Sequence, residues 1–147
     1  YTMVGYNNRP DATASTLRDG WLFTGDIGRL DADGFLYLLD RKNDMVISGG
    51  MNVYTSEVES EIVDVDGVQQ VAVIGVPHPD WGEAVVAFVV PEEGEDDHAA
   101  LTERVVAKCR ADLAKYKVPK QITIVDELPT TVFGKIDKKA LRSGAGG

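Results

Sequence analysis

The chain of 147 residues is long enough for one ordinary domain, or for a small domain with part of another. Its 44% hydrophobic and 27% charged residues are typical of a soluble globular protein, and no apolar run approaches the roughly 20 residues of a transmembrane segment. The net charge of −9 argues against a nucleic-acid-binding protein, which would carry a basic stripe.

The first forty residues are rich in turn formers and predict only short elements. A helical turn is expected around residues 13–17, and a brief strand over 21–24. Residues 28–31 and 35–39 flank the dipeptide Asp33-Gly34, which favours a β-hairpin.

A polar break follows this hairpin. Residues 40–44, Asp-Arg-Lys-Asn-Asp, contain no apolar side chain, which is typical of a domain boundary or a hinge. The chain also starts with Tyr1 and not with methionine, which favours a fragment of a longer protein.

The remainder of the chain alternates strands and helices, which predicts an α+β domain. In chain order the expected elements are a strand over 45–47, a tight turn at 48–50, a strand over 51–54, a helix from 55, strands over 68–76 and 83–90, a helix over 98–113, a strand over 121–125 and a helical turn after 136. Ser56 and Glu59 have the spacing of a capping box at the start of the first helix. The nearly continuous apolar run of residues 83–90 predicts a strand that is buried on both faces.

Few residues suggest redox or metal chemistry. The single cysteine, Cys109, excludes an internal disulfide, and it lies on the apolar face of a predicted helix, which indicates a buried structural thiol. This use of cysteine fits a cytoplasmic protein. The two histidines and the cysteine are far apart and have no metal-ligand spacing, so no metal site is predicted. His78 lies between two prolines with no nucleophile nearby, and we expect it to be structural.

Lys135 follows Gly134 in a loop just before a short basic helix. A flexible glycine would place the ammonium group of this lysine at a loop tip, from which it can be carried into a cleft and set against an anion. Taken alone this motif is weak, because most such lysines are solvated surface residues.

Three further segments have a functional and a purely structural interpretation. Asp26, in Thr24-Gly25-Asp26, can accept hydrogen bonds from ribose hydroxyls or can simply form a turn. Arg41 can contact ribose oxygens or an α-phosphate, or it can form an ion pair with Asp40 or Asp44. The glycines of Ser48-Gly49-Gly50 can let a ligand approach the backbone, or they can serve only a tight turn.

Taken in order, the segments 20–28, 40–59 and 128–136 resemble those of the acyl-CoA synthetases in the adenylate-forming ligase superfamily, and the resemblance covers residues 5–142. It implies the small C-terminal domain of these enzymes, with a three-stranded sheet flanked by helices and a leading β-hairpin. Residues 1–40 would be the incomplete end of the large N-terminal adenylation domain. Residues 41–147 would be the mobile C-terminal domain, with its hinge near 40–43.

The resemblance also implies a role for each candidate residue. Lys135 would be catalytic, bridging the substrate carboxylate and the α-phosphate. The nucleotide-binding residues would be Asp26, Leu38 and Arg41, and the hinge would be Asn43, where the family usually has lysine or aspartate. Ser48, Gly49 and Gly50 would line the path of the CoA pantetheine arm.

The implied reaction joins a carboxylic acid to coenzyme A in two steps, through an acyl-adenylate made from ATP. Mg²⁺ would accompany ATP and would be bound mainly by the N-terminal domain, so the fragment by itself is expected to be inactive. The expected partners are the acid, ATP, CoA and the chain's own N-terminal domain. Two alternatives remain open: an adenylating enzyme that loads the pantetheine of a carrier protein, and a stand-alone α+β interaction module.

Overall fold

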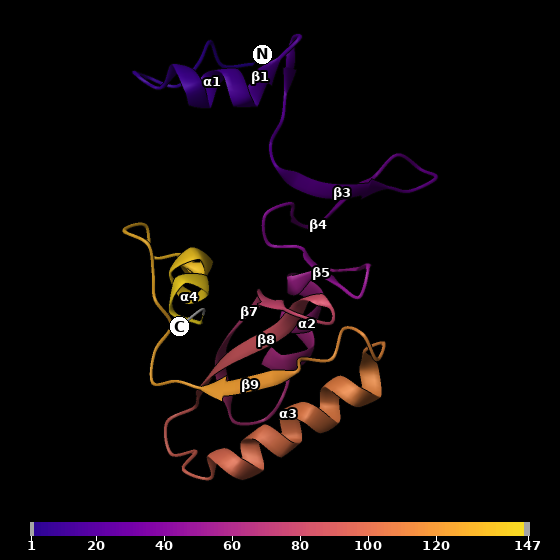
Figure 1. The fold of residues 1–147 in the computed structure, drawn as a ribbon, viewed down its shortest axis with the longest axis vertical. Coiled ribbons are helices and arrows are strands. Elements are labelled where there is room, and N and C mark those ends of the chain that lie inside the picture. The colour runs from indigo at the N-terminus through magenta and orange to yellow at the C-terminus, as the bar shows by residue number, and fades with distance from the viewer. Residues whose placement is uncertain (1, 146–147) are drawn as a thin grey trace. The chain divides into compact units, whose positions relative to one another are not determined.

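The computed structural model describes residues 2–145, which belong to two compact units, residues 1–43 and residues 44–147 (Figure 1). Each unit has its own secondary structure and is described separately below. Within the described residues, no helix combines the length and the apolar character needed to cross a membrane.

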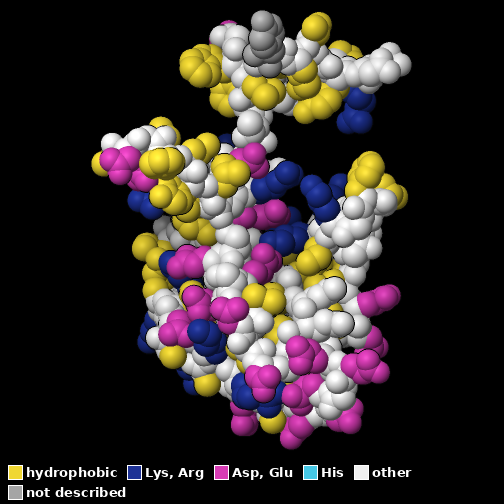
Figure 2. Space-filling model, turned by 180° about the vertical axis from the view of Figure 1, so that it is seen from behind, with side chains coloured by type: hydrophobic (Ala, Val, Ile, Leu, Met, Phe, Trp, Pro, Cys, Tyr) yellow, Lys and Arg dark blue, Asp and Glu magenta, His cyan; other side chains and the backbone are white. Residues whose placement is uncertain are grey.

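The first unit contains one short helix and two β-hairpins. Its elements in chain order are α1 (Pro10–Thr16), β1 (Leu17–Arg18), β2 (Trp21–Leu22), β3 (Asp26–Leu30) and β4 (Leu36–Arg41). β1 and β2 are antiparallel and are joined by Asp19 and Gly20, whose φ angles of 51° and 80° are those of the type I′ turn that suits a two-residue hairpin. None of the described residues before Asp44 is buried, and hydrophobic side chains are visible on the surface of this unit in Figure 2.

The hairpin predicted around Asp33-Gly34 is confirmed as β3 and β4. Its turn is held by Asp31, whose Oδ1 accepts hydrogen bonds from the N–H groups of Asp33 (3.0 Å) and Phe35 (2.9 Å). The predicted helical turn is confirmed as α1, although it begins earlier, at Pro10, because proline suits the first position of a helix. The strand expected over 21–24 ends at Leu22.

The second unit is an α+β domain, which confirms the predicted fold class. Its elements in chain order are β5 (Val46–Ser48), β6 (Met51–Val53), α2 (Thr55–Val63), β7 (Val68–His78), β8 (Gly82–Pro91), α3 (His98–Asp112), β9 (Gln121–Ile124) and α4 (Lys138–Ala145). The sheet has the order β6-β5-β8-β7, and β9 pairs in parallel with β8. The predicted leading hairpin, β5–β6, joins the three strands β7, β8 and β9 through one pair, Ser48 with Gly82, so that the sheet has five strands.

Helices pack on both faces of this sheet. Under α2 and α3 lies a buried cluster that includes Val58, Ile62, Val71, Val73, Val85, Leu101, Val105 and Cys109. On the other face, a second cluster includes Ala72, Ile74, Val86, Val90, Leu128 and Leu141 of α4. Successive residues of β7 and β8 alternate between the two clusters, which confirms that the apolar run 83–90 is buried on both faces.

α2 starts where the sequence predicts, but its cap differs from the prediction. The helix begins at Thr55 with Tyr54 at the N-cap and without a side-chain hydrogen bond to the cap. Ser56 therefore lies inside the first turn, and the predicted capping box was wrong. The carboxylate of Glu59 instead accepts a hydrogen bond from the backbone N–H of Val73 (2.7 Å), because this N–H of β7 needs an acceptor and α2 packs beside the strand.

Candidate functional site

Lys135 follows the tip of a hairpin loop that is open to solvent. The N–H of Thr131 donates to the carbonyl of Lys135 (2.7 Å), and the N–H of Gly134 donates to the carbonyl of Thr131 (2.9 Å). Gly134 has a φ of 76°, so the loop is a tight turn completed by a glycine in the left-handed region. Phe133 at the tip is 87% exposed, and Lys135 is exposed as well. Lys135 thus occupies the exposed loop position that the sequence predicts.

The base of this hairpin leads directly into α4. Thr130 pairs with Ile136, and the N–H of Asp137 donates to the carbonyl of Pro129 (2.7 Å). Asp137 also begins the helix, since its Oδ1 accepts a hydrogen bond from the N–H of Lys139 (3.0 Å). The position of Lys135 therefore depends on where α4 is held.

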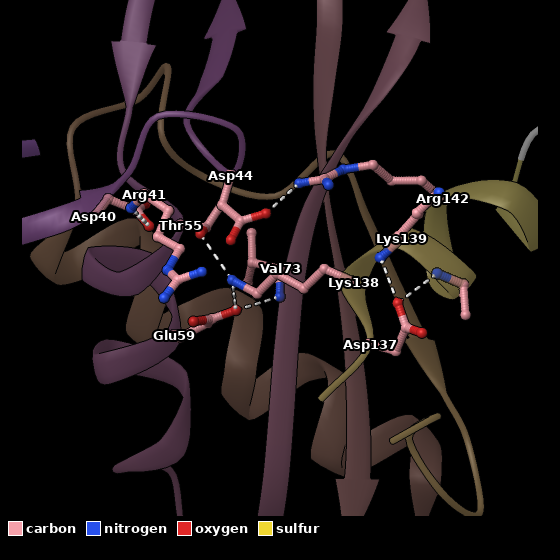
Figure 3. Close-up of polar contacts among 11 residues, drawn as sticks. Asp40, Arg41, Asp44, Thr55, Glu59, Val73, Asp137, Lys138, Lys139 and Arg142 are labelled. Atoms are coloured by element: carbon pink, nitrogen blue, oxygen red, sulfur yellow. Dashed lines mark hydrogen bonds and ion pairs between the residues drawn. The ribbon is translucent and has the colours of Figure 1, made fainter. Parts of the chain in front are cut away.

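Two ion pairs hold α4 against the rest of the second unit (Figure 3). The ammonium nitrogen of Lys138 lies 2.7 Å from Oε1 of Glu59 and donates a hydrogen bond to the hydroxyl of the buried Thr55 (2.9 Å). Arg142 lies one helical turn later, and its Nη2 is 2.8 Å from Oδ1 of Asp44. Lys138 and Arg142 are four residues apart and so share one face of the helix.

The Ser48-Gly49-Gly50 segment is the turn between β5 and β6. Ser48 is buried and pairs with Met51, so the two glycines are the central residues of the turn, with φ angles of 58° and 79°. The N–H of Gly49 donates to the carbonyl of Trp81 (2.9 Å) and fixes the turn against the loop between β7 and β8. A side chain at Gly50 would meet nothing within 4 Å, so the backbone there is open to a ligand.

Asp26 and Arg41 are cross-strand partners on β3 and β4. Nε of Arg41 is 3.5 Å from Oδ1 of Asp26, and the two side chains are 70% and 34% exposed. Such an exposed ion pair contributes about 0–1 kcal/mol, so a ligand can separate the two groups at little cost. An ion pair of Arg41 with Asp40 or Asp44 was the predicted structural alternative, and the structure shows an ion pair of Arg41 with Asp26.

Asp26 also borders a pocket of the first unit. The pocket has a volume of ≈ 430 Å³, and its lining includes Thr24, Gly25 and Lys42. The N–H of Asp26 donates to the hydroxyl of Thr24 (3.1 Å), and the N–H of Lys42 donates to the carbonyl of Gly25 (2.8 Å). These bonds fix the backbone on both sides of the carboxylate.

Leu38 shares one face of the hairpin with Arg41, although residues three apart on a regular strand face opposite sides. On β3, Asp26 pairs with Arg41 and Gly28 pairs with Leu38, and the register shifts between these pairs. Cross-strand partners share a face, and so do residues two apart on β3. The extra residue in β4, Leu39, forms a bulge that brings Leu38 and Arg41 to the same side.

The candidate residues are divided between the two units. Asp26, Leu38, Arg41 and Asn43 belong to the first unit, and Ser48, Gly49, Gly50 and Lys135 belong to the second. The boundary falls between Asn43 and Asp44. The residues that hold α4, Glu59, Lys138, Asp44 and Arg142, were missed as site residues by sequence analysis, and the only signal for them was the four-residue spacing of two cations in a basic helix.

The potentially reactive side chains of His78 and Cys109 make packing contacts. His78 is the last residue of β7, and its ring stacks on Trp81 with 4.1 Å between ring centroids. Cys109 is buried in α3, which confirms the prediction, and its burial raises the pKa of the thiol to about 11. Across residues 2–145, no three or more His, Cys, Asp or Glu side chains form a group that could hold a metal ion.

The chain is similar in sequence to several CoA ligases. A 2-succinylbenzoate–CoA ligase from a Geobacillus species is 46% identical over 94% of this chain, and a long-chain-fatty-acid–CoA ligase from Salmonella typhimurium is 47% identical over 99%. The crystal structure of ATP-bound MatB from Rhodopseudomonas palustris superposes with a TM-score of 0.83 at 43% identity and covers 96% of the chain.

The chain spans only 27% and 25% of the lengths of the two ligases, and 28% of the MatB chain. Residues 57–135 match the family described as the AMP-binding enzyme C-terminal domain. The matched region runs from α2 to Lys135 and thus includes most of the second unit. The chain therefore belongs to the AMP-binding enzyme C-terminal domain family.

Proposed function

We propose that this chain is the C-terminal part of an ATP-dependent carboxylic acid–CoA ligase, in which residues 1–40 complete a large N-terminal domain and residues 41–147 turn about a hinge near 40–43. The observation that carries the proposal is the placement of Lys135 and the Gly49-Gly50 turn within one unit. The hairpin before α4 and the β5–β6 turn project from opposite sides of the second unit in Figure 1. A domain that presents these two loops in alternation can serve two consecutive reactions.

The first reaction forms the acyl-adenylate. A carboxylate oxygen of the acid attacks the α-phosphorus of ATP, the new acyl–phosphate bond forms, and pyrophosphate leaves. Lys135 stabilises the charge that shifts between the carboxylate and the α-phosphate oxygens. Asp26 accepts hydrogen bonds from the ribose hydroxyls, and Arg41 contacts the nucleotide with Leu38 packed beside it. Mg²⁺ would accompany ATP and be bound mainly by the N-terminal domain.

The second reaction forms the thioester. After rotation near Asn43, the turn of Ser48, Gly49 and Gly50 lines the path of the pantetheine arm. The thiolate sulfur of CoA attacks the acyl carbon, the thioester bond forms, and AMP leaves with the electron pair of the broken acyl–phosphate bond. The open backbone at Gly50 supports this assignment, because no atom lies within 4 Å of the place that a side chain would take, so a ligand can approach the backbone closely.

The identity of the acid does not follow from this chain. The relatives at 46% and 47% identity are named for very different acids, a succinylbenzoate and long-chain fatty acids. We therefore place the acyl pocket in the N-terminal domain and expect the 147-residue chain alone to release no pyrophosphate from ATP and acid.

The proposal is tested by measuring the two half-reactions separately in the full-length ligase. Lys135→Ala should slow pyrophosphate release by about 10²-fold, or some 3 kcal/mol, because one preorganised charge is lost. It should leave thioester formation from preformed acyl-adenylate nearly unchanged. Gly50→Leu should do the opposite, because its side chain obstructs the pantetheine path but not adenylation.

Equal slowing of both steps by Lys135→Ala would contradict the alternating roles of the two loops. The acceptor is tested in the same assay by offering either CoA or a carrier protein bearing pantetheine. Acyl transfer to the carrier protein alone would replace the CoA ligase assignment with that of a carrier-loading enzyme. If full-length protein forms no adenylate from any acid, the chain belongs to an interaction module instead.

A further inference from the structure

We infer that the ion pair between Arg142 and Asp44 positions Lys135 for adenylation. The pair holds α4 against Asp44, which is the first residue after the unit boundary. This inference rests on the proposed function, because it assigns a purpose to the pair only if Lys135 acts in adenylation. Arg142 and Asp44 would contact no substrate and would act through Lys135, as positioning residues.

Asp44 lies at the boundary between the two units. It directly follows Asn43, so it is the first residue of the second unit to move when the backbone turns at the hinge. The buried Val46 comes two residues later, at the start of β5. The pair with Arg142 therefore joins α4 to the short segment between the unit boundary and the first buried residue of β5.

The position of Lys135 follows that of α4. The helix follows the hairpin base at Ile136 and Asp137 without an intervening loop, so a tilt of α4 moves the hairpin with it. The ion pair of Arg142 lies farther along the helix from the hairpin base than the contacts of Lys138 and of the buried Leu141. A contact at this distance adds to the restraint that Lys138 and the buried Leu141 place on the tilt of the helix.

The contact between Arg142 and Asp44 is short and partly shielded from solvent. Nη2 of Arg142 lies 2.8 Å from Oδ1 of Asp44, and the two side chains are 32% and 22% exposed. A partly desolvated, charge-assisted hydrogen bond is stronger and more directional than an exposed surface pair. Catalytic groups that act by electrostatic stabilisation lose much of their effect when displaced by about 1 Å, so such a restraint has a measurable consequence.

The Gly49-Gly50 turn does not depend on this pair. It is fixed by the sheet through Ser48 and by the hydrogen bond from Gly49 to Trp81. Loss of the Arg142–Asp44 pair should therefore affect adenylation and spare thioester formation. A general loss of folded structure would slow both.

The experiment uses the full-length ligase and its two half-reactions. Arg142→Ala and Asp44→Ala should each slow adenylation by about tenfold, mainly in kcat, and should change thioester formation by less than about threefold. The double variant Asp44→Ala with Arg142→Ala should be no slower than either single variant, because both remove the same contact. Lys135→Ala combined with Arg142→Ala should be no slower than Lys135→Ala alone, because no lysine is left to position.

The matched control is Lys108→Ala. It removes an ion pair of similar exposure between α3 and α2, in which Lys108 and Glu61 are 34% and 30% exposed and lie 3.1 Å apart, together with a pair of Lys108 and Asp112 within α3 (2.7 Å). This variant should leave both half-reactions unchanged. Thermal unfolding of every variant distinguishes positioning from loss of folded protein.

The outcomes separate the two proposals. If Lys135→Ala does not selectively slow adenylation, the proposed function is wrong. Suppose instead that Lys135→Ala slows adenylation selectively, and that adding Arg142→Ala slows adenylation further, by the same factor as in the wild-type background. In that case, or if Arg142→Ala alone slows both half-reactions equally, the positioning role is wrong and the pair serves stability alone.

Discussion

Lys138 and Glu59 form an ion pair in which Nζ and Oε1 are 2.7 Å apart and the side chains are only 16% and 22% exposed. The carboxylate of Glu59 also accepts the N–H of Val73 in β7, and the ammonium of Lys138 also donates to Thr55 in α2. One pair of side chains therefore joins α2, β7 and α4. Removal of either partner leaves a partly desolvated charge without its counter-charge, which costs more than the loss of an exposed pair.

Lys138→Met should consequently destabilise the second unit by about 1–3 kcal/mol. The measurement is urea unfolding of the 147-residue chain. Lys139→Met is the control, because Lys139 is the exposed neighbour on the same helix and should change stability by less than about 0.5 kcal/mol. Identical unfolding midpoints for the two variants would show that the pair does not stabilise the fold.

Gly134→Val should distort the hairpin that carries Lys135. The φ of 76° at Gly134 lies in the left-handed region, which costs an ordinary residue about 1–2 kcal/mol, although a side chain there would meet no neighbouring atom. Gly134→Asn should be milder, because asparagine tolerates this conformation.

On the proposed function, the measurement is pyrophosphate release by the full-length protein, in which we expect valine to slow the step more than asparagine does. Gly144→Ala in α4 also meets open space but lies in a helix, where alanine is favoured, so it should be neutral or slightly stabilising. Equal rates for the two Gly134 variants would mean that its backbone conformation has no part in placing Lys135.

Cys109 should be inert in the folded chain. Its side chain is buried in α3, and burial raises the pKa of the thiol from 9.0 to about 11, so almost no thiolate exists at pH 8. Because the folded pKa is raised, the contribution of this group to stability is present below pH 9 and is lost as the pH rises toward about 11.

A disulfide reagent such as DTNB at pH 8 measures this reactivity. The native chain should react very slowly, whereas the chain unfolded in guanidinium should react completely within minutes. Complete labelling of the native chain at the unfolded rate would mean that α3 does not protect the thiol.

The two units should differ in amide hydrogen exchange when the 147-residue chain is studied alone. Trp21 is 74% exposed, and no described residue before Asp44 is buried, so little apolar contact opposes local opening in the first unit. We expect fast exchange over 1–40 and slow exchange over 71–90, where β7 and β8 lie between two clusters. Equal protection in both regions would contradict the view that residues 1–40 need a missing domain for packing.

Features of the fold that depend on neighbouring residues could be predicted from the sequence. Asp33-Gly34 and Gly134-Lys135 mark tight turns by their own conformational preferences, and the spacing of Leu101, Val105 and Cys109 marks the buried face of α3. The continuous apolar run in β8 likewise revealed that both of its faces are covered.

Features that depend on distant residues could not be predicted in this way. Leu38 and Arg41 share a face because of a bulge that has no marker in the sequence of β4. Glu59 has the spacing of a local capping box with Ser56. Its carboxylate instead accepts a hydrogen bond from the backbone N–H of Val73 in β7, which is distant in the sequence. The partners Asp44 and Arg142 are 98 positions apart, so only the assembled sheet brings them together.

The parallel pairing of β9 with β8 has a consequence for the order of folding. β7 and β8 are joined by a loop of three residues, so their contacts form at a small loss of chain entropy. β9 reaches β8 only after the chain has passed through α3, and a parallel pair with such a long connection closes slowly. We expect the β7–β8 hairpin with α2 to form the folding nucleus. Substitutions there would slow refolding, and substitutions in β9 or α4 would chiefly accelerate unfolding.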